Sequence, residues 1–87
     1  MKMVVLYAHW CPKCSMMMPI VDEMEVHYGE KLQIERIDVE KYPESMKEYG
    51  AEIVPTFILY TDTSEIGRMA GMIGEKTMYQ RIDSLFL

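Results

Sequence analysis

The chain has 87 residues, of which 49% are hydrophobic and 26% charged, and this length fits one domain over residues 1–87 with a limited core. Nine basic residues are scattered among fourteen acidic ones, and the net charge of −5 argues against a nucleic acid partner. Because no apolar run reaches transmembrane length, and the apolar stretch after Met1 and Lys2 is too short for a secretory leader, we expect a cytoplasmic protein with no membrane partner.

The hydrophobic pattern of the first half of the chain predicts a strand, a helix and a second strand. Residues 3–8 form a nearly unbroken apolar run of strand length, which is typical of a strand covered on both faces. From residue 11 to residue 28 the apolar residues recur with helical spacing, and Gly29 provides a C-terminal stop. Residues 32–39 alternate between apolar and polar side chains, as in a strand with one more buried face.

The second half predicts a short helix, a hairpin and a closing helix. The short helix spans residues 43–50, beginning at a proline and ending at a glycine. Residues 56–61 and 65–70 have the composition of strands and are joined by a turn at residues 62–64, so these two strands are antiparallel. Residues 75–86 have the pattern of an amphipathic helix.

The order of these elements is β-α-β-α-β-β-α, which predicts an α/β fold. The helical crossover between the first two strands makes them parallel, with a right-handed connection. A four-stranded mixed sheet flanked by three helices follows. Sites in such sheets gather where a parallel strand ends and a helix begins, and Cys11 lies at such a place.

Cys11 and Cys14 are the most informative residues of the sequence. A disulfide between them closes too small a loop to stabilise a fold, so the pair is expected to do chemistry or to bind metal. If Cys11 caps the helix, Pro12 takes the first helical position and the Cys11 sulfur faces unpaired amides. These amides and the helix dipole lower the pKa of Cys11. The charge of Lys13 either adds to this effect or serves only the solubility of the helix. Cys11 is then the nucleophile and Cys14 the resolving thiol.

Several segments together resemble the thioredoxin-fold family, in the form of a minimal thioredoxin or glutaredoxin. They are the first strand with His-Trp-Cys-Pro-Lys-Cys at residues 9–14, Pro-Ile-Val-Asp-Glu at residues 19–23, Ile-Val-Pro-Thr at residues 53–56, and Gly71. A lone Cys-x-x-Cys is a weak motif, but the strand and helix around it and the downstream Val-Pro-Thr make the combination specific. The resemblance implies a thioredoxin-like fold in which Pro19 kinks the first helix, although sequence rules alone end that helix near Met18.

The resemblance also implies an activity and a set of site residues. It implies a thiol–disulfide oxidoreductase whose two cysteines are catalytic and whose redox-active disulfide makes any other cofactor unnecessary. In this family the proline at the position of Pro55 is cis and lies against the sulfurs, which leaves the Val54 backbone free to pair with an extended substrate. The alternative from the sequence alone is a rigid proline at a strand entry. Trp10 and Gly71 complete the expected substrate-binding residues.

The chain departs from the family pattern at positions that matter for mechanism. Val5 stands where thioredoxins carry a buried aspartate that handles the proton of the resolving cysteine, and Ile34 stands where the lysine partner of that aspartate is found. Pro12 and Lys13 place proline in the glutaredoxin position, yet the Gly-Gly-x-Asp element with which glutaredoxins bind glutathione is absent. We therefore expect thioredoxin-type activity in a scaffold of glutaredoxin size.

Without a buried acid, Cys14 must lose its proton to water, to the departing thiolate or to His9. His9 lies two residues before Cys11, where it either tunes the cysteine pair near neutral pH or is a solvated loop histidine.

Two other classes of function stay open beside the redox interpretation. A metal site needs two more ligands near the cysteines, and His27 lies far down the helix, so zinc within one chain is not expected. A metal or iron–sulfur cluster carried across a dimer is one alternative, and a redox-inert thioredoxin-fold binding module is the other. The preferred function is reduction of disulfides in protein substrates by a monomer that receives electrons from a reductase or from glutathione.

Overall fold

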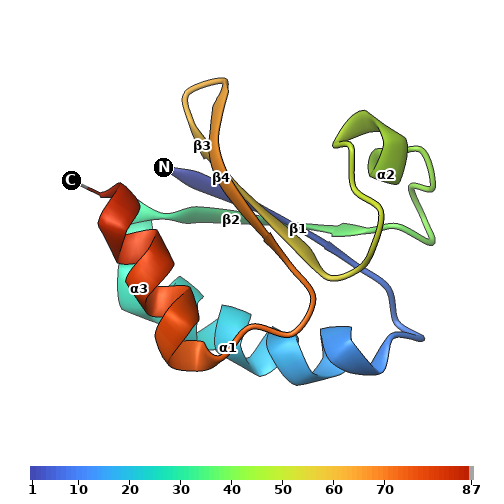
Figure 1. Cartoon of the computed structure of the whole chain (residues 1–87), viewed down its shortest axis with the longest axis horizontal. Helices are drawn as coiled ribbons and strands as arrows, with labels where there is room; N and C mark the ends of the chain where they lie inside the picture. Colours follow the sequence, from blue (N-terminus) through green and yellow to red (C-terminus); the bar gives the residue numbers. More distant parts are fainter. Residues whose placement is uncertain (87) are drawn as a thin grey trace.

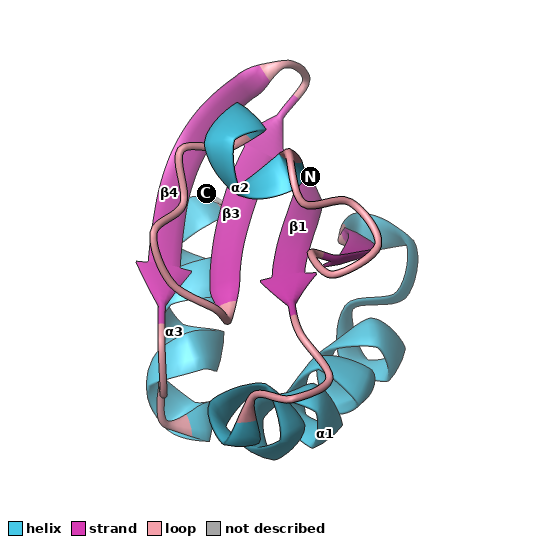
Figure 2. Ribbon diagram, turned by 90° about the vertical axis from the view of Figure 1, so that its right-hand side faces the viewer, coloured by secondary structure: helices cyan, strands magenta, loops and turns pink. Residues whose placement is uncertain are grey.

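A computed structural model describes residues 1–86 of the chain (Figure 1). Its centre is a four-stranded sheet with the strand order β2-β1-β3-β4. Two helices, α1 (Pro12–Tyr28) and α3 (Glu75–Leu85), cover one face of this sheet, and the short helix α2 (Ser45–Glu48) lies on the other face (Figure 1, Figure 2). The predicted α/β fold, with a mixed sheet of four strands and three helices, is confirmed.

The parallel pair and the antiparallel hairpin that the order of elements predicts are both present in the sheet. β1 (Lys2–Tyr7) lies inside the sheet and pairs in parallel with β2 (Gln33–Asp38). On its other side β1 pairs in antiparallel fashion with β3 (Thr56–Thr61), which forms a hairpin with β4 (Ser64–Ala70). The carboxyl ends of β1 and β2 therefore lie at the same edge of the sheet, where the chain turns into α1.

β1 begins and ends one residue earlier than the apolar run predicts. Its ladder with β2 starts at Lys2 and stops at the pair of Tyr7 with Asp38. Ala8 is buried like the strand residues, but it lies beyond the ladder and its carbonyl accepts a turn hydrogen bond instead. The apolar pattern of the sequence indicates which residues are buried, and Ala8 is buried although strand pairing ends at Tyr7.

α1 is one helix of 17 residues that runs through Pro19. The chain leaves it through Gly29, whose φ of 54° lies in the left-handed region that glycine adopts at little cost, and then makes the short 3-10 turn η1 (Gly29–Lys31). The buried residues of α1 recur at helical spacing and form one stripe: Cys14, Met17, Val21, Met24 and Tyr28.

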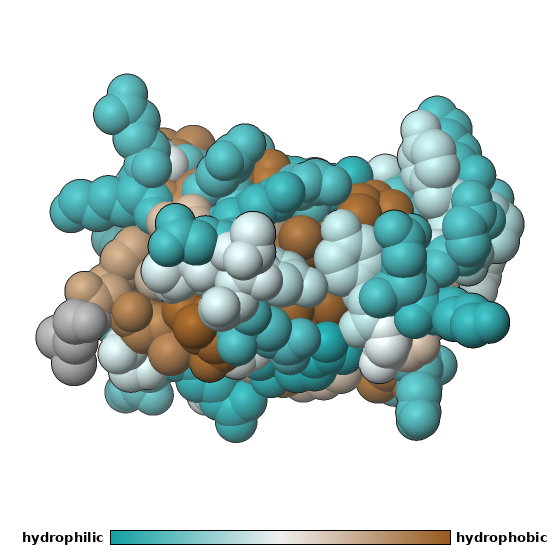
Figure 3. All heavy atoms as spheres, turned by 90° about the horizontal axis from the view of Figure 1, so that it is seen from above, coloured by the Kyte–Doolittle hydropathy of each residue, from teal (hydrophilic) through white to brown (hydrophobic). Residues whose placement is uncertain are grey.

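β1 is buried on both faces and separates two clusters of core residues. Met3 and Val5 belong to the larger cluster, under α1 and α3. Val4 and Leu6 point to the other face, where they join Ile58 beneath α2. Burial on both faces explains why the first strand is almost continuously apolar in sequence. Seen from above, the molecule is covered mainly by hydrophilic side chains (Figure 3).

Arg68 on the edge strand β4 ties the end of α2 to the sheet. Its guanidinium donates hydrogen bonds to the backbone carbonyls of Tyr49, at 2.9 Å, and Gly50, at 3.2 Å, which directly follow α2. The carboxylate of Glu65 accepts two further bonds from the same guanidinium at 2.6 and 2.7 Å. The four-residue helix α2 is thus held in place by the planar donor array of an arginine.

Candidate active site

Cys11 caps α1, as the sequence predicts. Its backbone is extended, with φ −91° and ψ 113°, and its sulfur accepts a hydrogen bond from the Cys14 backbone N–H at 3.3 Å. Pro12 takes the first helical position, where the absence of an N–H leaves nothing unpaired. The Cys11 N–H bonds back to the Ala8 carbonyl at 3.3 Å and closes the turn after β1. The Cys11 sulfur therefore lies at the positive end of the helix dipole.

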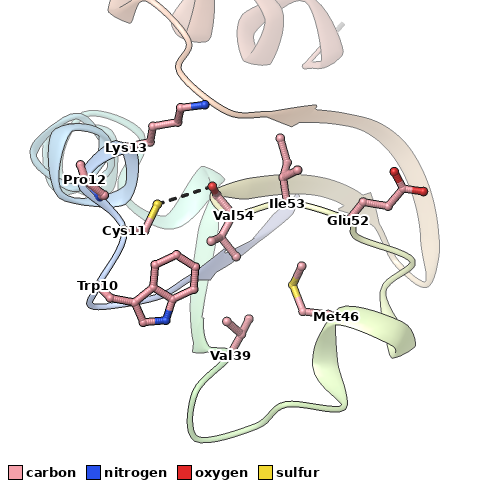
Figure 4. Close-up of a pocket in the computed structure, with 9 residues that line it drawn as sticks. All are labelled: Trp10, Cys11, Pro12, Lys13, Val39, Met46, Glu52, Ile53 and Val54. Atoms are coloured by element: carbon pink, nitrogen blue, oxygen red, sulfur yellow. Dashed lines mark hydrogen bonds between the residues drawn. The ribbon is translucent and has the colours of Figure 1, made fainter.

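The two cysteines are free thiols in a small buried cluster with Ala8. Cys11 is 5% exposed and Cys14 is 1% exposed. The Cys11 thiol donates a hydrogen bond to the backbone carbonyl of Val54, 3.6 Å away (Figure 4). The structure thus brings three of the predicted site residues into one place, with Cys11 in front and Cys14 behind it.

The two thiols differ in acidity. Burial raises the pKa of Cys11, but hydrogen bonds to its sulfur from the Cys14 thiol and from the Cys14 and Lys13 backbone outweigh burial. The charge of Lys13 acts in the same direction as these bonds, so the pKa of Cys11 lies below its ordinary value. Burial raises the pKa of Cys14 to about 11, although a backbone hydrogen bond from Ala8 opposes this shift. The thiolate therefore forms first on Cys11.

An apolar groove of about 620 Å³ opens beside the Cys11 sulfur (Figure 4). The start of α1, the loop before β3 and the segment between β2 and α2 each contribute to it. Its lining consists of Trp10, Cys11, Pro12, Lys13, Val39, Met46, Glu52, Ile53 and Val54. Trp10 is 68% exposed, so a large flat apolar side chain borders the groove without being part of the core.

Four of these residues were not predicted from the sequence as part of the site. Val39 and Met46 have the pattern of core residues, at the end of a strand and in a short helix, and nothing in the sequence marks them as groove residues. Glu52 and Ile53 directly precede the Val-Pro-Thr segment. Ile53 is 49% exposed. An isoleucine directly before the Val-Pro-Thr segment is the one sequence feature from which an apolar docking surface could have been inferred.

Pro55 and Gly71 lie next to the groove but do not line it. The Val54–Pro55 peptide bond is cis. The Pro55 carbonyl accepts a hydrogen bond from the Gly71 N–H at 2.8 Å. Gly71 has φ +80°, a backbone conformation in which a side chain is strained. Gly71 therefore joins the end of β4 to the proline loop, and the loop in turn presents Val54 to Cys11.

Val5 and Ile34 are apolar, so the sheet has no acid next to the cysteines at the position where thioredoxins carry a buried aspartate. Val5 is fully buried in the larger core cluster, and Ile34 packs against that cluster. Within residues 1–86 the buried acid is Asp38, at the end of β2. Its Oδ2 lies 3.1 Å from Nε2 of His9, so this histidine is held by a partner although its side chain is 74% exposed.

The described part of the chain, residues 1–86, contains no group of three or more His, Cys, Asp or Glu side chains that could hold a metal ion. His27 lies near the far end of α1 and makes edge-on contacts with the rings of Tyr28 and Tyr79. No helix in these residues is both long and apolar enough to cross a membrane.

The sequence and the fold of this chain are similar to those of proteins named as thioredoxins. The chain is 40% identical over 81 residues to "Thioredoxin Y1, chloroplastic" from Arabidopsis thaliana, which covers 93% of this chain and 47% of that protein. It is 31% identical over 80 residues to "Thioredoxin-like protein slr0233" from Synechocystis sp., which covers 92% of this chain and 76% of that protein. The solved structure of the germline-specific thioredoxin Deadhead from Drosophila melanogaster has a TM-score of 0.88 at 26% identity, covering 97% of this chain and 79% of that one.

The Y-type relatives correct one expectation. The chain spans about half the length of these proteins, 47% for Thioredoxin Y1 and 49% for two others from rice and Arabidopsis thaliana. All three are named as chloroplastic proteins, so the predicted cytoplasmic location is wrong. Charge and hydropathy could not have decided this question, because a small acidic α/β domain has the same composition in either compartment.

The family profile described as Thioredoxin matches residues 1–84. This range includes both cysteines, the proline loop and every strand of the sheet. The chain therefore belongs to the thioredoxin family.

Proposed function

We propose that this protein is a thiol–disulfide oxidoreductase that reduces disulfides in protein substrates and acts as a single domain. The observation that carries the proposal is the Cys11 sulfur at the first turn of α1, where it accepts the Cys14 N–H at 3.3 Å. The lowered pKa of Cys11 supports a nucleophilic role. Family membership and the relatives named as thioredoxins support the same activity.

In the proposed cycle the Cys11 thiolate attacks one sulfur of a substrate disulfide. A bond forms between Cys11 and that sulfur, and the other substrate sulfur leaves as a thiolate. Cys14 then loses its proton and attacks the Cys11 sulfur, which releases the second substrate thiolate and leaves a disulfide between Cys11 and Cys14. Two electrons pass from the protein to the substrate, and the cysteine pair alone carries them, so the proposed cycle uses no separate cofactor.

The groove is the proposed binding surface for the substrate. Trp10 offers a flat apolar face next to the reacting sulfur. The backbone of Val54 is proposed to pair with an extended substrate segment, in the manner of an added strand. Pro55 and Gly71 contribute by fixing the shape of this loop. Such a surface suits a disulfide in an extended or locally unfolded segment of a protein.

Pro12 and Lys13 are the proposed tuning residues of the site. Pro12 begins α1 without adding an N–H donor of its own, and Lys13 places a positive charge near the Cys11 sulfur. Because the Lys13 side chain is in contact with solvent, we expect its influence on the pKa of Cys11 to weaken as salt is added.

Electrons must return to the oxidised cysteine pair from a partner. We propose that a reductase supplies them, with glutathione as the alternative donor, and that the protein works as a monomer. Relatives named as thioredoxins favour this activity over a redox-inert binding module or a dimeric metal or iron–sulfur carrier.

The test is reduction of insulin disulfides with dithiothreitol as the electron source, combined with a redox titration of the purified protein. We expect catalysed precipitation of insulin and a single two-electron transition that consumes both thiols. The Cys11→Ser/Cys14→Ser double variant is the matched control and should match the uncatalysed rate. A wild-type rate equal to that of this control would rule out the proposed activity.

A further inference from the structure

A second cavity, of about 270 Å³, reaches Cys14 and is separate from the substrate groove. Cys14, His9, Tyr7 and Arg36 are among the residues that line it, and none of its lining residues is shared with the groove. The two thiols therefore open onto different spaces: Cys11 onto the groove and Cys14 onto this cavity. We call it the rear cavity.

Cys14 needs an acceptor for its proton during the proposed cycle. Only the thiolate attacks a disulfide, and burial keeps the pKa of Cys14 at about 11. The larger core cluster behind it is apolar, with Val5 fully buried. The rear cavity is thus the space through which the Cys14 proton can leave.

His9 is the basic group of the rear cavity. Its Nε2 lies 3.1 Å from Oδ2 of Asp38. Asp38 is buried, and its other oxygen accepts the Glu40 backbone N–H at 2.9 Å. The carboxylate of Glu40 in turn accepts the His9 backbone N–H at 3.1 Å. His9 is therefore fixed through both its side chain and its backbone.

The partner of the ring decides which nitrogen is the base. A carboxylate accepts a hydrogen bond only from a protonated nitrogen, so the neutral His9 ring carries its proton on Nε2 and Nδ1 has the free lone pair. When Nδ1 takes up a proton, the ring becomes a cation whose Nε2–H still bonds to Oδ2 of Asp38, 3.1 Å away.

The other ionisable groups around the rear cavity do not compete for the proton. Arg36 is already a cation, and Asp22 and Glu25 on α1 pair with it at 2.8 and 2.6 Å. The Tyr7 ring lies edge-on to the His9 ring, with 5.6 Å between their centres. A phenol is a proton donor and not an acceptor near neutral pH. His9 is thus the base that faces this space.

We propose that His9 accepts the proton of Cys14 while the mixed disulfide is resolved, and that Asp38 is the positioning residue for the His9 ring. This inference rests on the proposed oxidoreductase function. A water molecule in the rear cavity, which is large enough to hold one, passes the proton from Cys14 to Nδ1 of His9. The Cys14 thiolate then attacks the Cys11 sulfur, the bond from Cys11 to the substrate breaks, and the substrate leaves with the electron pair. The imidazolium returns its proton to that thiolate or to solvent.

The test uses reduced protein mixed with one equivalent of the chromogenic disulfide dithiobis(nitrobenzoate). Attack by Cys11 releases the first coloured thiolate, and attack by Cys14 releases the second, so two phases report the two steps separately. We expect His9→Asn to leave the first phase unchanged. We expect the second phase to slow about tenfold near neutral pH, less than a positioned base usually contributes, because water and the departing thiolate still accept protons.

The pH profile distinguishes proton transfer from a structural effect. In the wild type, base catalysis should keep the second phase fast near neutral pH, whereas in His9→Asn the second phase should depend on hydroxide and show only an alkaline rise. Asp38→Asn, which removes the charge of the positioning residue, should slow the second phase and leave the first unchanged, and added imidazole should restore the second phase of His9→Asn. His27→Asn, which removes the other histidine, should change neither phase.

An unchanged second phase in His9→Asn, or an equal slowing of both phases, would overturn the role of His9. Failure of the proposed function has a different signature. In that case the wild type reduces insulin no faster than Cys11→Ser/Cys14→Ser, whereas the two phases with the chromogenic disulfide still report on His9.

Discussion

The Cys11 thiol donates a hydrogen bond to the Val54 carbonyl, 3.6 Å away, and so joins the start of α1 to the proline loop across 43 positions of the sequence. The contact places the reacting sulfur at the backbone that is proposed to hold the substrate. It also means that the protonated form of Cys11 has a partner on the loop, whereas the thiolate form relies on the Cys14 N–H.

Replacing each cysteine in turn should separate their roles. Cys11→Ser removes the nucleophile and should abolish insulin reduction. Cys14→Ser leaves the nucleophile but not the resolving thiol, so it should accumulate mixed disulfides with protein substrates. Non-reducing gel electrophoresis after incubation with oxidised substrate measures this trapping. Equal trapping by both variants would contradict the assignment.

Alkylation of Cys11 should be fast at a pH at which ordinary thiols are still protonated. Because the pKa of Cys11 is lowered, its thiolate forms at a lower pH than that of an ordinary cysteine. The rate of alkylation by iodoacetamide should therefore reach half of its maximum at that lower pH. Lys13→Gln should move this midpoint upward, and added salt should reduce the difference between the two proteins. A midpoint at the value of a free thiol would contradict the proposed activation of Cys11. Lys76→Gln, on α3, is the matched control for loss of one positive charge.

Cys14 should make the reduced protein less stable at alkaline pH. Burial raises its pKa from 9.0 to about 11, so above pH 9 the unfolded chain loses this proton while the folded chain keeps it. The free energy of unfolding should therefore fall between about pH 9 and about pH 11, by up to about 3 kcal/mol. Urea unfolding of reduced wild type and Cys14→Ala at several pH values measures the difference. The same alkaline loss in both proteins would show that other groups cause it.

Val5→Asp should supply a second route for the Cys14 proton. We expect the substitution to lower the free energy of unfolding by about 3 kcal/mol, because it buries a carboxyl in an apolar cluster. It should also speed the second phase of the chromogenic disulfide reaction, most clearly in the His9→Asn background. Val4→Asp is the matched control, since Val4 is equally buried but faces α2. A gain in rate with both variants would point to general loosening of the sheet.

Trp10→Ala should weaken the use of protein substrates while sparing the chemistry of the cysteines. Trp10 is a large exposed side chain on the groove, and residues of this kind carry much of the free energy of docking. We expect kcat/KM for insulin to fall about tenfold, with little change in the reaction of a small disulfide. Val26→Ala, an 86% exposed apolar residue of α1 outside the groove, serves as control. An equal loss with the small disulfide would place the effect on the chemistry.

Local patterns were enough to predict most of the fold and the centre of the site. The continuous apolar run gave the doubly covered strand β1, and the Cys11-Pro12 step gave the cap and first position of α1. These predictions succeeded because the apolar run and the capping residues are patterns among neighbouring residues of the sequence.

What the sequence could not predict depends on contacts between distant residues. The pairing of His9 with Asp38 joins the loop after β1 to the last residue of β2, and no spacing rule connects these two residues. Met46 looks like an ordinary core residue until Arg68 fixes α2 beside the groove. The location was predicted wrongly because composition carries no information on the compartment.

The attachment of α2 through Arg68 has a consequence for how specificity can change. Met46 on α2 forms part of the groove wall, whereas the arginine that anchors α2 lies on the edge strand β4 and does not line the groove. Lysine at the anchor could not reproduce two carbonyl contacts and a forked carboxylate pair together. We therefore expect a substitution of Arg68 to loosen α2 and to alter the Met46 side of the groove, while the hydrogen bonds to the Cys11 sulfur stay in place.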